Sequence, residues 1–263
     1  MSHRPKPTPV SRVARISAYQ VPRHGAPIDL PLDGNEGPIA ALDLSAVLGD
    51  APTLVNRYPS ARRLQEQWAA RLGIEPTRVR VTAGADEALD RIIRTFVGPG
   101  REMLATEPSF EMLPRYCALA GGRYVTVPWP SGPFPTAALL ERISPRTSLV
   151  TVVTPNNPTG LVATIDDIRR LAAAAPHAVV LVDLAYVEFA DVDPVREVLA
   201  LPNAIVTRTL SKAWGLAGLR VGCAAGAADL IASLAAAGNP YPVSGLSLAL
   251  ASVALDMDDS RVA

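Results

Sequence analysis

The sequence contains very little lysine. Lys6 and Lys212 are the only lysines among its 25 basic residues, and all the others are arginines. Arginine stays protonated in proteins, whereas a desolvated lysine can lose its proton and act as an amine nucleophile that forms a Schiff base. Lys6 lies in a proline-rich start. Lys212 is therefore the candidate nucleophile, and the alternative interpretation is an ordinary surface lysine.

Cysteine is equally rare, and neither sign of charge is in excess. The two cysteines, Cys117 and Cys223, lie far apart in the sequence, which predicts reduced core residues in a cytoplasmic protein and no metal site. The formal net charge is zero, so we expect no nucleic-acid partner. Residues 1–15 contain no apolar segment, and we therefore expect no secretory signal.

One long stretch lacks charge altogether. Residues 230–255 contain no Asp, Glu, Lys or Arg, and the stretch is long enough to span a membrane. A Gly-Asn-Pro-Tyr-Pro run interrupts it, and two prolines with a glycine would break a spanning helix. We predict two buried helices joined by a turn, and no membrane association.

Short apolar runs alternate with helix-like segments through most of the chain. The runs are typical of buried strands, and they cover residues 79–82, 102–106, 121–127, 148–153, 179–182 and 204–208. A returning strand after the Lys212 segment would begin at Arg220. Strands that alternate with helices predict an α/β fold with a mostly parallel sheet that is covered by helices on both faces.

Polar residues follow several of these predicted strands. Asp183 ends a continuous apolar run, where a carboxylate is costly unless it is paired; a helix N-cap is the alternative role. A strand, Gly84 and a helix follow one another, and the N–H groups at such a helix start can bind phosphate. The hydroxyls of Thr209 and Ser211 and the guanidinium of Arg220 flank Lys212 and could hold the same phosphate.

The residues around Lys212 also carry a family pattern. The run from Ser211 to Arg220 reads S-K-x-x-G-L-x-G-x-R, which resembles the cofactor-lysine segment of pyridoxal-phosphate enzymes of the aspartate aminotransferase fold. Further motifs of that family occur in family order, namely N-E-x-P, R-Y-P, G-A-D-E, E-P-x-F and N-N-P-T-G. Together they most resemble the histidinol-phosphate aminotransferases. The family's D-E-A-Y is here D-L-A-Y, with Leu184 in place of the glutamate.

The resemblance implies pyridoxal 5'-phosphate as the cofactor and assigns a role to each matching residue. Lys212, Asp183 and Tyr186 would be catalytic. Asn35, Tyr58 and Asn157 would contact the substrate. On the residues alone, Phe110 is either core or a ring that stacks on the cofactor. The resemblance implies these cofactor-binding residues: Tyr58, Gly84, Ala85, Asp86, Phe110, Asn157, Asp183, Tyr186, Thr209, Ser211, Lys212 and Arg220.

The reaction and the partners also follow from the resemblance. It implies transfer of the amino group of histidinol phosphate to 2-oxoglutarate, in histidine biosynthesis, by a ping-pong cycle. It also implies a homodimer, because the family's R-Y-P tyrosine, here Tyr58, reaches the cofactor phosphate of the neighbouring subunit. Threonine-phosphate decarboxylation and transamination of aromatic amino acids stay open as alternatives, because the cofactor motifs do not separate them.

The resemblance implies two domains of unequal size. Residues 1–35 would form an N-terminal arm with a small-domain segment, and residues 36–263 a pyridoxal-phosphate-binding large domain. Family members continue into a small C-terminal domain whose arginine binds the substrate carboxylate, and we expect most of that domain to be absent from these 263 residues. A further alternative is therefore a non-catalytic remnant that binds the cofactor or only dimerises.

Overall fold

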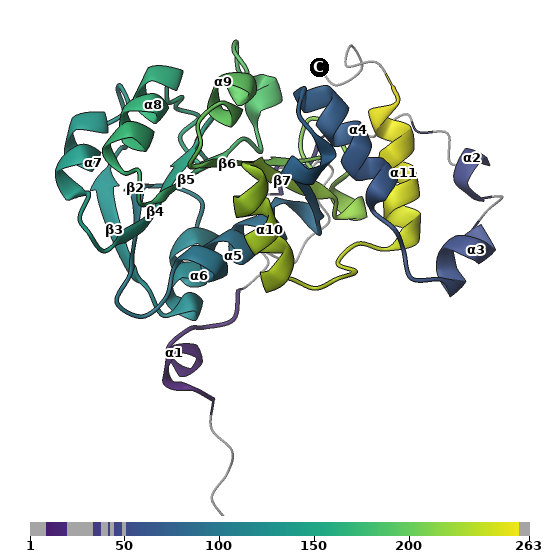
Figure 1. Cartoon of the computed structure of the whole chain (residues 1–263), viewed down its shortest axis with the longest axis horizontal. Coiled ribbons are helices and arrows are strands. Elements are labelled where there is room, and N and C mark those ends of the chain that lie inside the picture. The colour runs from purple at the N-terminus through teal and green to yellow at the C-terminus, as the bar shows by residue number, and fades with distance from the viewer. Residues whose placement is uncertain (1–8, 20–33, 38–41, 43–44, 49–50, 258–263) are drawn as a thin grey trace, which may run out of the picture.

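The structure is a computed structural model, and it describes residues 9–19, 34–37, 42, 45–48 and 51–257 (Figure 1). Seven strands form one sheet in the order β1-β7-β6-β5-β4-β2-β3. The strands are β1 (Val79–Thr82), β2 (Glu102–Glu107), β3 (Arg123–Pro128), β4 (Thr147–Val153), β5 (Val179–Asp183), β6 (Ala204–Thr209) and β7 (Gly222–Gly226).

The sheet is mostly parallel, as predicted. The pairs β2–β3, β2–β4, β4–β5 and β5–β6 are parallel, and β7 runs antiparallel to both of its neighbours. The parallel strands therefore all end at one edge of the sheet, where such folds bind their ligands. The loops after β2, β4, β5 and β6 meet at this edge.

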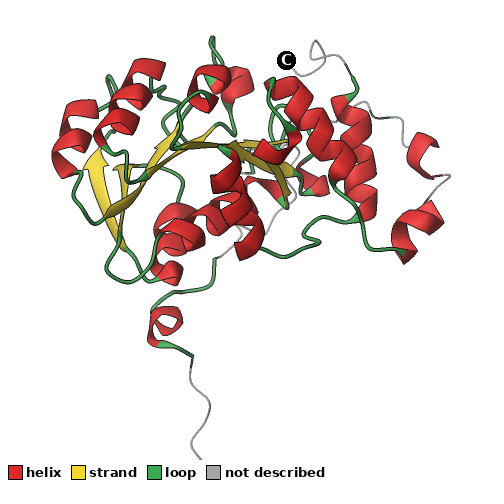
Figure 2. Cartoon of the chain, viewed as in Figure 1, coloured by secondary structure: helices red, strands yellow, loops and turns green. Residues whose placement is uncertain are grey.

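Helices cover both faces of the sheet (Figures 1 and 2). One face packs against α5 (Gly84–Phe96), α6 (Met112–Ala120) and α10 (Ala228–Ala237), and these helices share one apolar cluster. Helices on the other face contribute to a second cluster. They are α4 (Arg62–Leu72), α7 (Thr136–Arg142), α8 (Ile165–Ala174), α9 (Val195–Leu199) and α11 (Gly245–Leu255).

The strand sequences explain these two layers. All five residues of β5 are buried. Val180 and Val182 belong to the cluster with α8, whereas Val179 and Leu181 belong to the cluster with α5. Successive side chains of a strand point to opposite faces of the sheet, so a strand covered on both faces reads as a continuous apolar run. The prediction of a sheet with two covered faces is confirmed.

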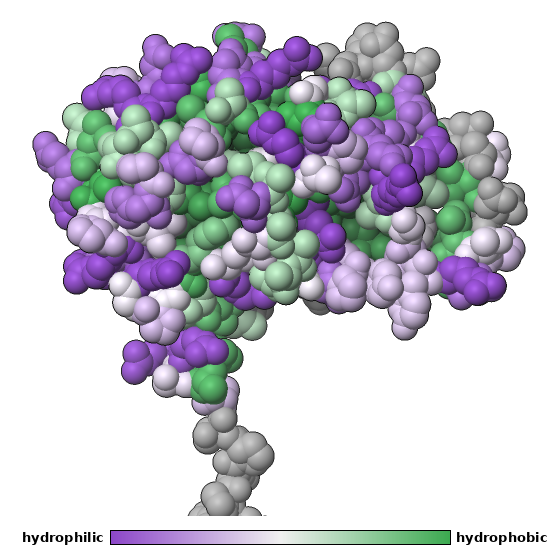
Figure 3. All heavy atoms as spheres, in the orientation of Figure 1, coloured by the Kyte–Doolittle hydropathy of each residue, from purple (hydrophilic) through white to green (hydrophobic). Residues whose placement is uncertain are grey.

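The uncharged stretch 230–255 forms the two separate helices α10 and α11, as predicted. The prediction that both are buried is wrong for α10, which buries Ile231 and Leu234 on one side and exposes Ala232 and Ser233 on the other. No helix in the described part of the chain is both long enough and apolar enough to cross a membrane. On the face shown in Figure 3, hydrophilic and hydrophobic side chains are interspersed.

The described N-terminal part is small. Residues 9–19 contain the single-turn helix α1 (Ser11–Ala14), which lies below the body of the molecule in Figure 1. The short helices α2 (Ser45–Leu48) and α3 (Ala51–Asn56) lie beside α11. Most of the predicted arm 1–35 falls outside the described residues, so the domain division at residue 35 stays a prediction.

Three single-turn 3₁₀ helices complete the described elements: η1 (Pro76–Arg78), η2 (Val187–Phe189) and η3 (Ala217–Leu219). The returning strand β7 begins at Gly222 rather than at Arg220. Arg220 has a left-handed backbone with φ 53°, which a strand cannot contain, so the chain turns there before it enters the sheet.

Candidate active site

A cavity of about 530 Å³ lies at the edge where the parallel strands end. It is formed by the loops after β2, β4, β5 and β6, the start of α5 and the segment around Asn35. Eleven residues predicted from the sequence line it: Asn35, Ala85, Asp86, Phe110, Asn157, Asp183, Tyr186, Thr209, Ser211, Lys212 and Arg220.

Lys212 follows β6 and projects into this cavity. Its Nζ donates a hydrogen bond of 2.9 Å to the carbonyl oxygen of Gly34 and lies 5.5 Å from the ring centroid of Tyr186. Partial burial lowers the pKa of the Lys212 amine, because it disfavours the charged form. Arg220 adds to this effect, whereas the carboxylates of Asp86, Glu36 and Asp183 oppose it without reversing it. The side chain is thus suited to lose its proton and to act as a nucleophile or a base.

The carboxylate of Asp183 lies at the end of β5 and is almost completely buried, with 4% of the residue exposed. It accepts hydrogen bonds from Thr207 Oγ1 at 2.7 Å and from the backbone N–H of Ala185 at 3.3 Å. Burial raises the pKa of Asp183 to about 6. The N-cap of the following turn η2 is Tyr186, so Asp183 does not cap a helix. A cationic group in the cavity would stabilise its charged form.

The position of Leu184 shows why D-L-A-Y can replace the family's D-E-A-Y. Its side chain is fully buried in the cluster on the α8 face of the sheet, and it does not line the cavity. Asp183 and Tyr186 line the cavity on either side of it in sequence. An apolar residue at this position therefore packs into the core and leaves the cavity wall unchanged.

Two amides converge on the hydroxyl of Tyr186. The Nδ2 of Asn35 donates to it at 3.2 Å and the Nδ2 of Asn157 at 3.5 Å. Burial raises the pKa of the Tyr186 phenol, and the charge of Asp183 adds to this effect. The contacts join three segments, namely the loop after β4, the loop after β5 and the segment around Asn35, at one wall of the cavity.

The opposite corner of the cavity gathers groups that bind anions. Gly84 starts α5 with φ 77°, a left-handed backbone conformation that favours glycine, and a Cβ there would lie 2.9 Å from Arg220 Nη2. Arg220 Nη2 forms an ion pair with Asp86 at 3.2 Å. Thr209 Oγ1 donates to Ser211 Oγ at 2.9 Å beside them. The first N–H groups of a helix have no partner within it, so this corner is a candidate phosphate site.

Tyr58 lies elsewhere. It is 83% exposed, and its ring stacks on Tyr241 with the centroids 4.6 Å apart. It lines a separate groove beside α11, together with residues of α3 and α4. Its own chain therefore does not bring Tyr58 to the cavity, and its role at the phosphate of a neighbouring subunit stays a prediction. Phe110 is half-buried, lines the cavity and also packs against the α5 cluster.

Sequence reasoning missed several lining residues, among them Tyr19, Ser109 and Tyr116. Tyr19 is held at the cavity by Arg115, whose guanidinium lies 5.7 Å from its ring centroid and whose Nη1 donates to Ser17 O at 2.7 Å. The arm around Tyr19 has no periodic pattern that could have indicated this contact. Tyr116 lies on α6, where the helical pattern indicates only packing.

Comparison with known proteins places this geometry in context. The family model for aminotransferase class I and II matches residues 40–262. The chain is 38% identical to an aromatic amino acid aminotransferase of Corynebacterium jeikeium over 245 residues, which are 90% of this chain and 65% of that protein. It is 33% identical to a histidinol-phosphate aminotransferase of Rhodospirillum centenum over 264 residues, 95% of this chain and 72% of that protein.

A solved structure agrees with the fold. The histidinol-phosphate aminotransferase of Sinorhizobium meliloti in complex with pyridoxal-5'-phosphate superposes with a TM-score of 0.84 at 26% identity, over 96% of this chain and 72% of that one. The chain thus spans about two thirds to three quarters of the length of these relatives. On the family match and these identities, the chain belongs to the class I and class II aminotransferase family.

Proposed function

We propose that this chain carries the cofactor site of a pyridoxal-phosphate-dependent aminotransferase. The observation that carries the proposal is the content of one cavity. It contains the Lys212 amine with a lowered pKa, the buried Asp183 carboxylate with a raised pKa, and an anion-binding corner with Arg220. An amine, a buried acid and an anion site in one cavity match the three parts of the cofactor, namely an aldehyde, a basic ring nitrogen and a phosphate.

The residues present fit this cofactor. The start of α5, Ser211 and Arg220 would hold the phosphate. Asp183 needs a cation to stabilise its buried charge, and a protonated ring nitrogen would supply one. Phe110 offers a ring face to the cavity, and Asn157 and Tyr186 offer hydrogen-bond donors to the ring oxygen.

When bound, pyridoxal phosphate supplies an aldehyde that condenses with amines and a ring that accepts electrons. The chain supplies the binding groups and the proton transfers. Lys212 Nζ, released from its bond to Gly34 O, takes and returns a proton as general base and acid. The carboxylate of Asp183, whose Oδ1 accepts a hydrogen bond from Thr207 Oγ1, would stabilise the proton on the ring nitrogen. Burial raises the pKa of the Tyr186 phenol above its ordinary value of 10.0, so the phenol stays a hydrogen-bond donor at neutral pH.

The proposed amino donor has an aromatic or imidazole ring, and the acceptor is a 2-oxo acid. Histidinol phosphate with 2-oxoglutarate is the first candidate, because the motifs resemble that family and named relatives carry that activity. An aromatic amino acid is the second, because a relative of 38% identity carries that name. The cavity is lined by four aromatic rings that would pack against such a donor, those of Tyr19, Phe110, Tyr116 and Tyr186.

We further propose a homodimer in which Tyr58 of each subunit completes the phosphate site of the other. Two observations support this arrangement: Tyr58 is exposed, and it lines a separate groove instead of its own chain's cavity.

Covalent trapping tests the proposal. The purified chain is mixed with pyridoxal phosphate, reduced with borohydride and digested, and the labelled peptide is mapped. We expect one label on Lys212 and none on the Lys212→Arg variant, since arginine cannot form the bond. A label on Lys6 or none at all would overturn the proposal. Absorbance changes on addition of histidinol phosphate or phenylalanine, before reduction, would then rank the two donors.

A further inference from the structure

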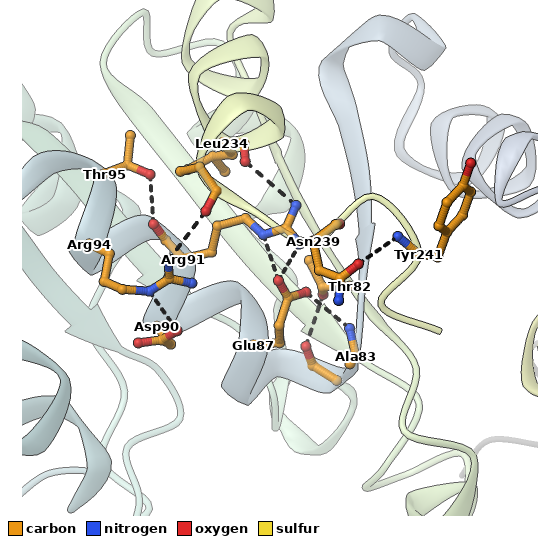
Figure 4. A network of polar contacts seen from close by, with 12 residues as sticks. Thr82, Ala83, Glu87, Asp90, Arg91, Arg94, Thr95, Leu234, Asn239 and Tyr241 are labelled. Carbon is orange, nitrogen blue, oxygen red and sulfur yellow. Dashed lines mark hydrogen bonds and ion pairs between the residues drawn. The ribbon is translucent and has the colours of Figure 1, made fainter. Parts of the chain in front are cut away.

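Arg91 is a fully buried charge that the cavity does not use. It lies in the middle of α5, and its side chain is 0% exposed. Its Nε donates to Glu87 Oε1 at 2.5 Å, and its Nη2 forms an ion pair with the same carboxylate. Its Nη1 and Nη2 also point at the carbonyl oxygens of Leu234 and Asn239, at 3.5 and 3.4 Å (Figure 4). A buried arginine with this set of partners is costly to keep, which indicates a specific role.

Glu87 connects Arg91 to the start of α5. Its second carboxylate oxygen, Oε2, accepts a hydrogen bond of 3.1 Å from the backbone N–H of Ala83, the N-cap residue of the helix (Figure 4). The carboxylate therefore lies against the helix N-terminus, beside the corner where the phosphate would bind. A negative charge at this place weakens the positive end of the helix dipole for any second anion.

The charges at this helix end are balanced in pairs. Asp86 is paired with Arg220, and Glu87 is paired with Arg91. Without Arg91, the carboxylate of Glu87 would lack its ion-pair partner at the start of α5. A second cation, Arg80 on β1, also interacts electrostatically with Glu87 and Arg91. Arg91 therefore neutralises a large part of the Glu87 charge, and Arg80 contributes to the rest.

Arg91 also orders the connection between α10 and α11. Gly238 packs directly on its guanidinium, where a Cβ would lie 1.9 Å from Cζ. Asn239, whose carbonyl oxygen accepts from Arg91, accepts a second bond at its Oδ1 from the N–H of Tyr241 at 2.9 Å. Tyr241 in turn stacks on Tyr58. One side chain thus links the start of α5 to the segment that supports Tyr58.

We propose that Arg91 is a positioning residue for cofactor phosphate: it neutralises Glu87 at the N-terminus of α5 and ties that helix to the loop between α10 and α11. The inference rests on the proposed function, since it concerns the phosphate of the same cofactor. It predicts that Arg91 affects ligands that carry the phosphate and spares those that lack it.

The test compares the dissociation constants of pyridoxal phosphate and pyridoxal, which differ by the phosphate alone, by absorbance titration of the full chain. For Arg91→Gln we expect about a 10-fold weaker affinity for pyridoxal phosphate and less than about a 2-fold change for pyridoxal, because the uncompensated carboxylate repels only the anion. The double variant Glu87→Gln with Arg91→Gln removes both charges, and we expect it to recover most of the loss.

Arg94 offers a matched control on the same helix. It pairs with Asp90 at 2.8 Å and points at the carbonyl oxygen of Ala237, but it faces solvent. We expect Arg94→Gln to leave both affinities unchanged. If Arg91→Gln fails to fold, the single variant Glu87→Gln keeps the inference testable, since it should strengthen pyridoxal phosphate binding by about 3-fold and leave pyridoxal unaffected.

Equal losses for the two ligands in Arg91→Gln, or no change in Glu87→Gln, would overturn the inference, because they would show a structural role without an effect on the phosphate. These outcomes leave Lys212 labelled by borohydride, so the proposed function would stand. Binding of neither ligand by the unaltered chain would overturn the proposed function itself.

Discussion

At the scale of single residues, Asp183 makes the stability of the chain depend on pH. A deeply buried acid prefers its neutral form, so the pKa in the folded chain rises from 3.8 to about 6, although the hydrogen bond from Thr207 and the charge of Lys212 oppose this shift. Between these values the folded state binds more protons than the unfolded state. The free energy of unfolding of the cofactor-free chain should therefore fall as the pH rises from about 4 to about 6. Above about pH 6, Asp183 should have little further effect on it.

The variant Asp183→Asn tests this effect. Asparagine keeps an oxygen that can accept from Thr207 Oγ1 and removes the charge. A rise in pKa from 3.8 to about 6 corresponds to about 3 kcal/mol, so we expect the cofactor-free variant to be more stable than the unaltered chain by up to about that amount at pH 7.5, and by much less at pH 4.5. Urea unfolding at the two pH values measures it. An equal gain at both would show that packing, not ionisation, is responsible.

The sequence indicated some site residues much better than others, for physical reasons. Lys212 could be recognised because almost every other cation is arginine, and Asp183 because a carboxylate ends a buried apolar run. Tyr19 and Tyr116 could not, since a tyrosine on a helix or in an arm has the same local pattern whether it faces a cavity or the core. Their positions depend on Arg115 and on the packing of α6 against α5.

At the scale of elements, two adjacent asparagines in the loop after β4 have different tasks. Asn156 is buried and joins two loops: its Oδ1 accepts from Ser109 at 2.9 Å, and its Nδ2 donates to Pro108 O at 3.0 Å and to Thr159 Oγ1 at 2.8 Å. Asn157 is half-buried, and its Nδ2 donates to the hydroxyl of Tyr186 at 3.5 Å. Asn156 therefore holds the loop in place, and Asn157 presents an amide to the cavity.

Alanine variants of the pair separate the two tasks. Asn156→Ala leaves three half-buried partners unsatisfied, and we expect it to lower the free energy of unfolding by about 2–3 kcal/mol. Asn157→Ala removes a long bond at the surface of the cavity, and we expect a change of less than about 0.5 kcal/mol together with weaker cofactor binding. Urea unfolding and absorbance titration of both variants measure these effects. Comparable destabilisation by the two variants would refute the division.

The elements themselves were largely predictable because buried parallel strands read as continuous apolar runs. Each of the six predicted apolar runs forms a strand, and its ends agree with the prediction or differ from it by one or two residues. The helix α9 was not predicted, since its five residues are too few to show a helical period. The start of β7 was predicted two residues early, because the left-handed backbone of Arg220 follows from its contacts at the cavity and not from its residue type.

At the scale of the whole molecule, the contacts that matter join residues far apart in the sequence. Arg91 with Asn239, and Tyr58 with Tyr241, connect positions more than 140 residues apart. Local periodicity describes only which face of an element is apolar, so a single sequence cannot indicate such pairs. The same limit holds for contacts between subunits, and the role of Tyr58 came from the family resemblance alone.

Mixing two inactive variants would show whether Tyr58 acts in a second copy of the chain. Lys212→Ala lacks the amine but keeps Tyr58, and Tyr58→Ala keeps the amine but would weaken the phosphate site of its partner. In a mixed dimer, one site combines an intact Lys212 with an intact Tyr58 from the other subunit. Random reassociation of equal amounts should therefore restore about one quarter of the sites, because half of the dimers are mixed and each has one complete site.

The amount of cofactor that borohydride fixes to the protein at low cofactor concentration measures the restored sites. Each variant alone should retain little, since one lacks the amine and the other lacks half of the phosphate site. A second mixture serves as a comparison, in which Tyr241→Ala replaces Tyr58→Ala as the partner of Lys212→Ala. Tyr241→Ala removes the ring that stacks on Tyr58 but keeps Tyr58 itself. If Tyr58 acted within its own chain, mixing would restore nothing. Restoration would instead place the 83% exposed Tyr58 at the neighbouring cavity, where its own fold cannot bring it.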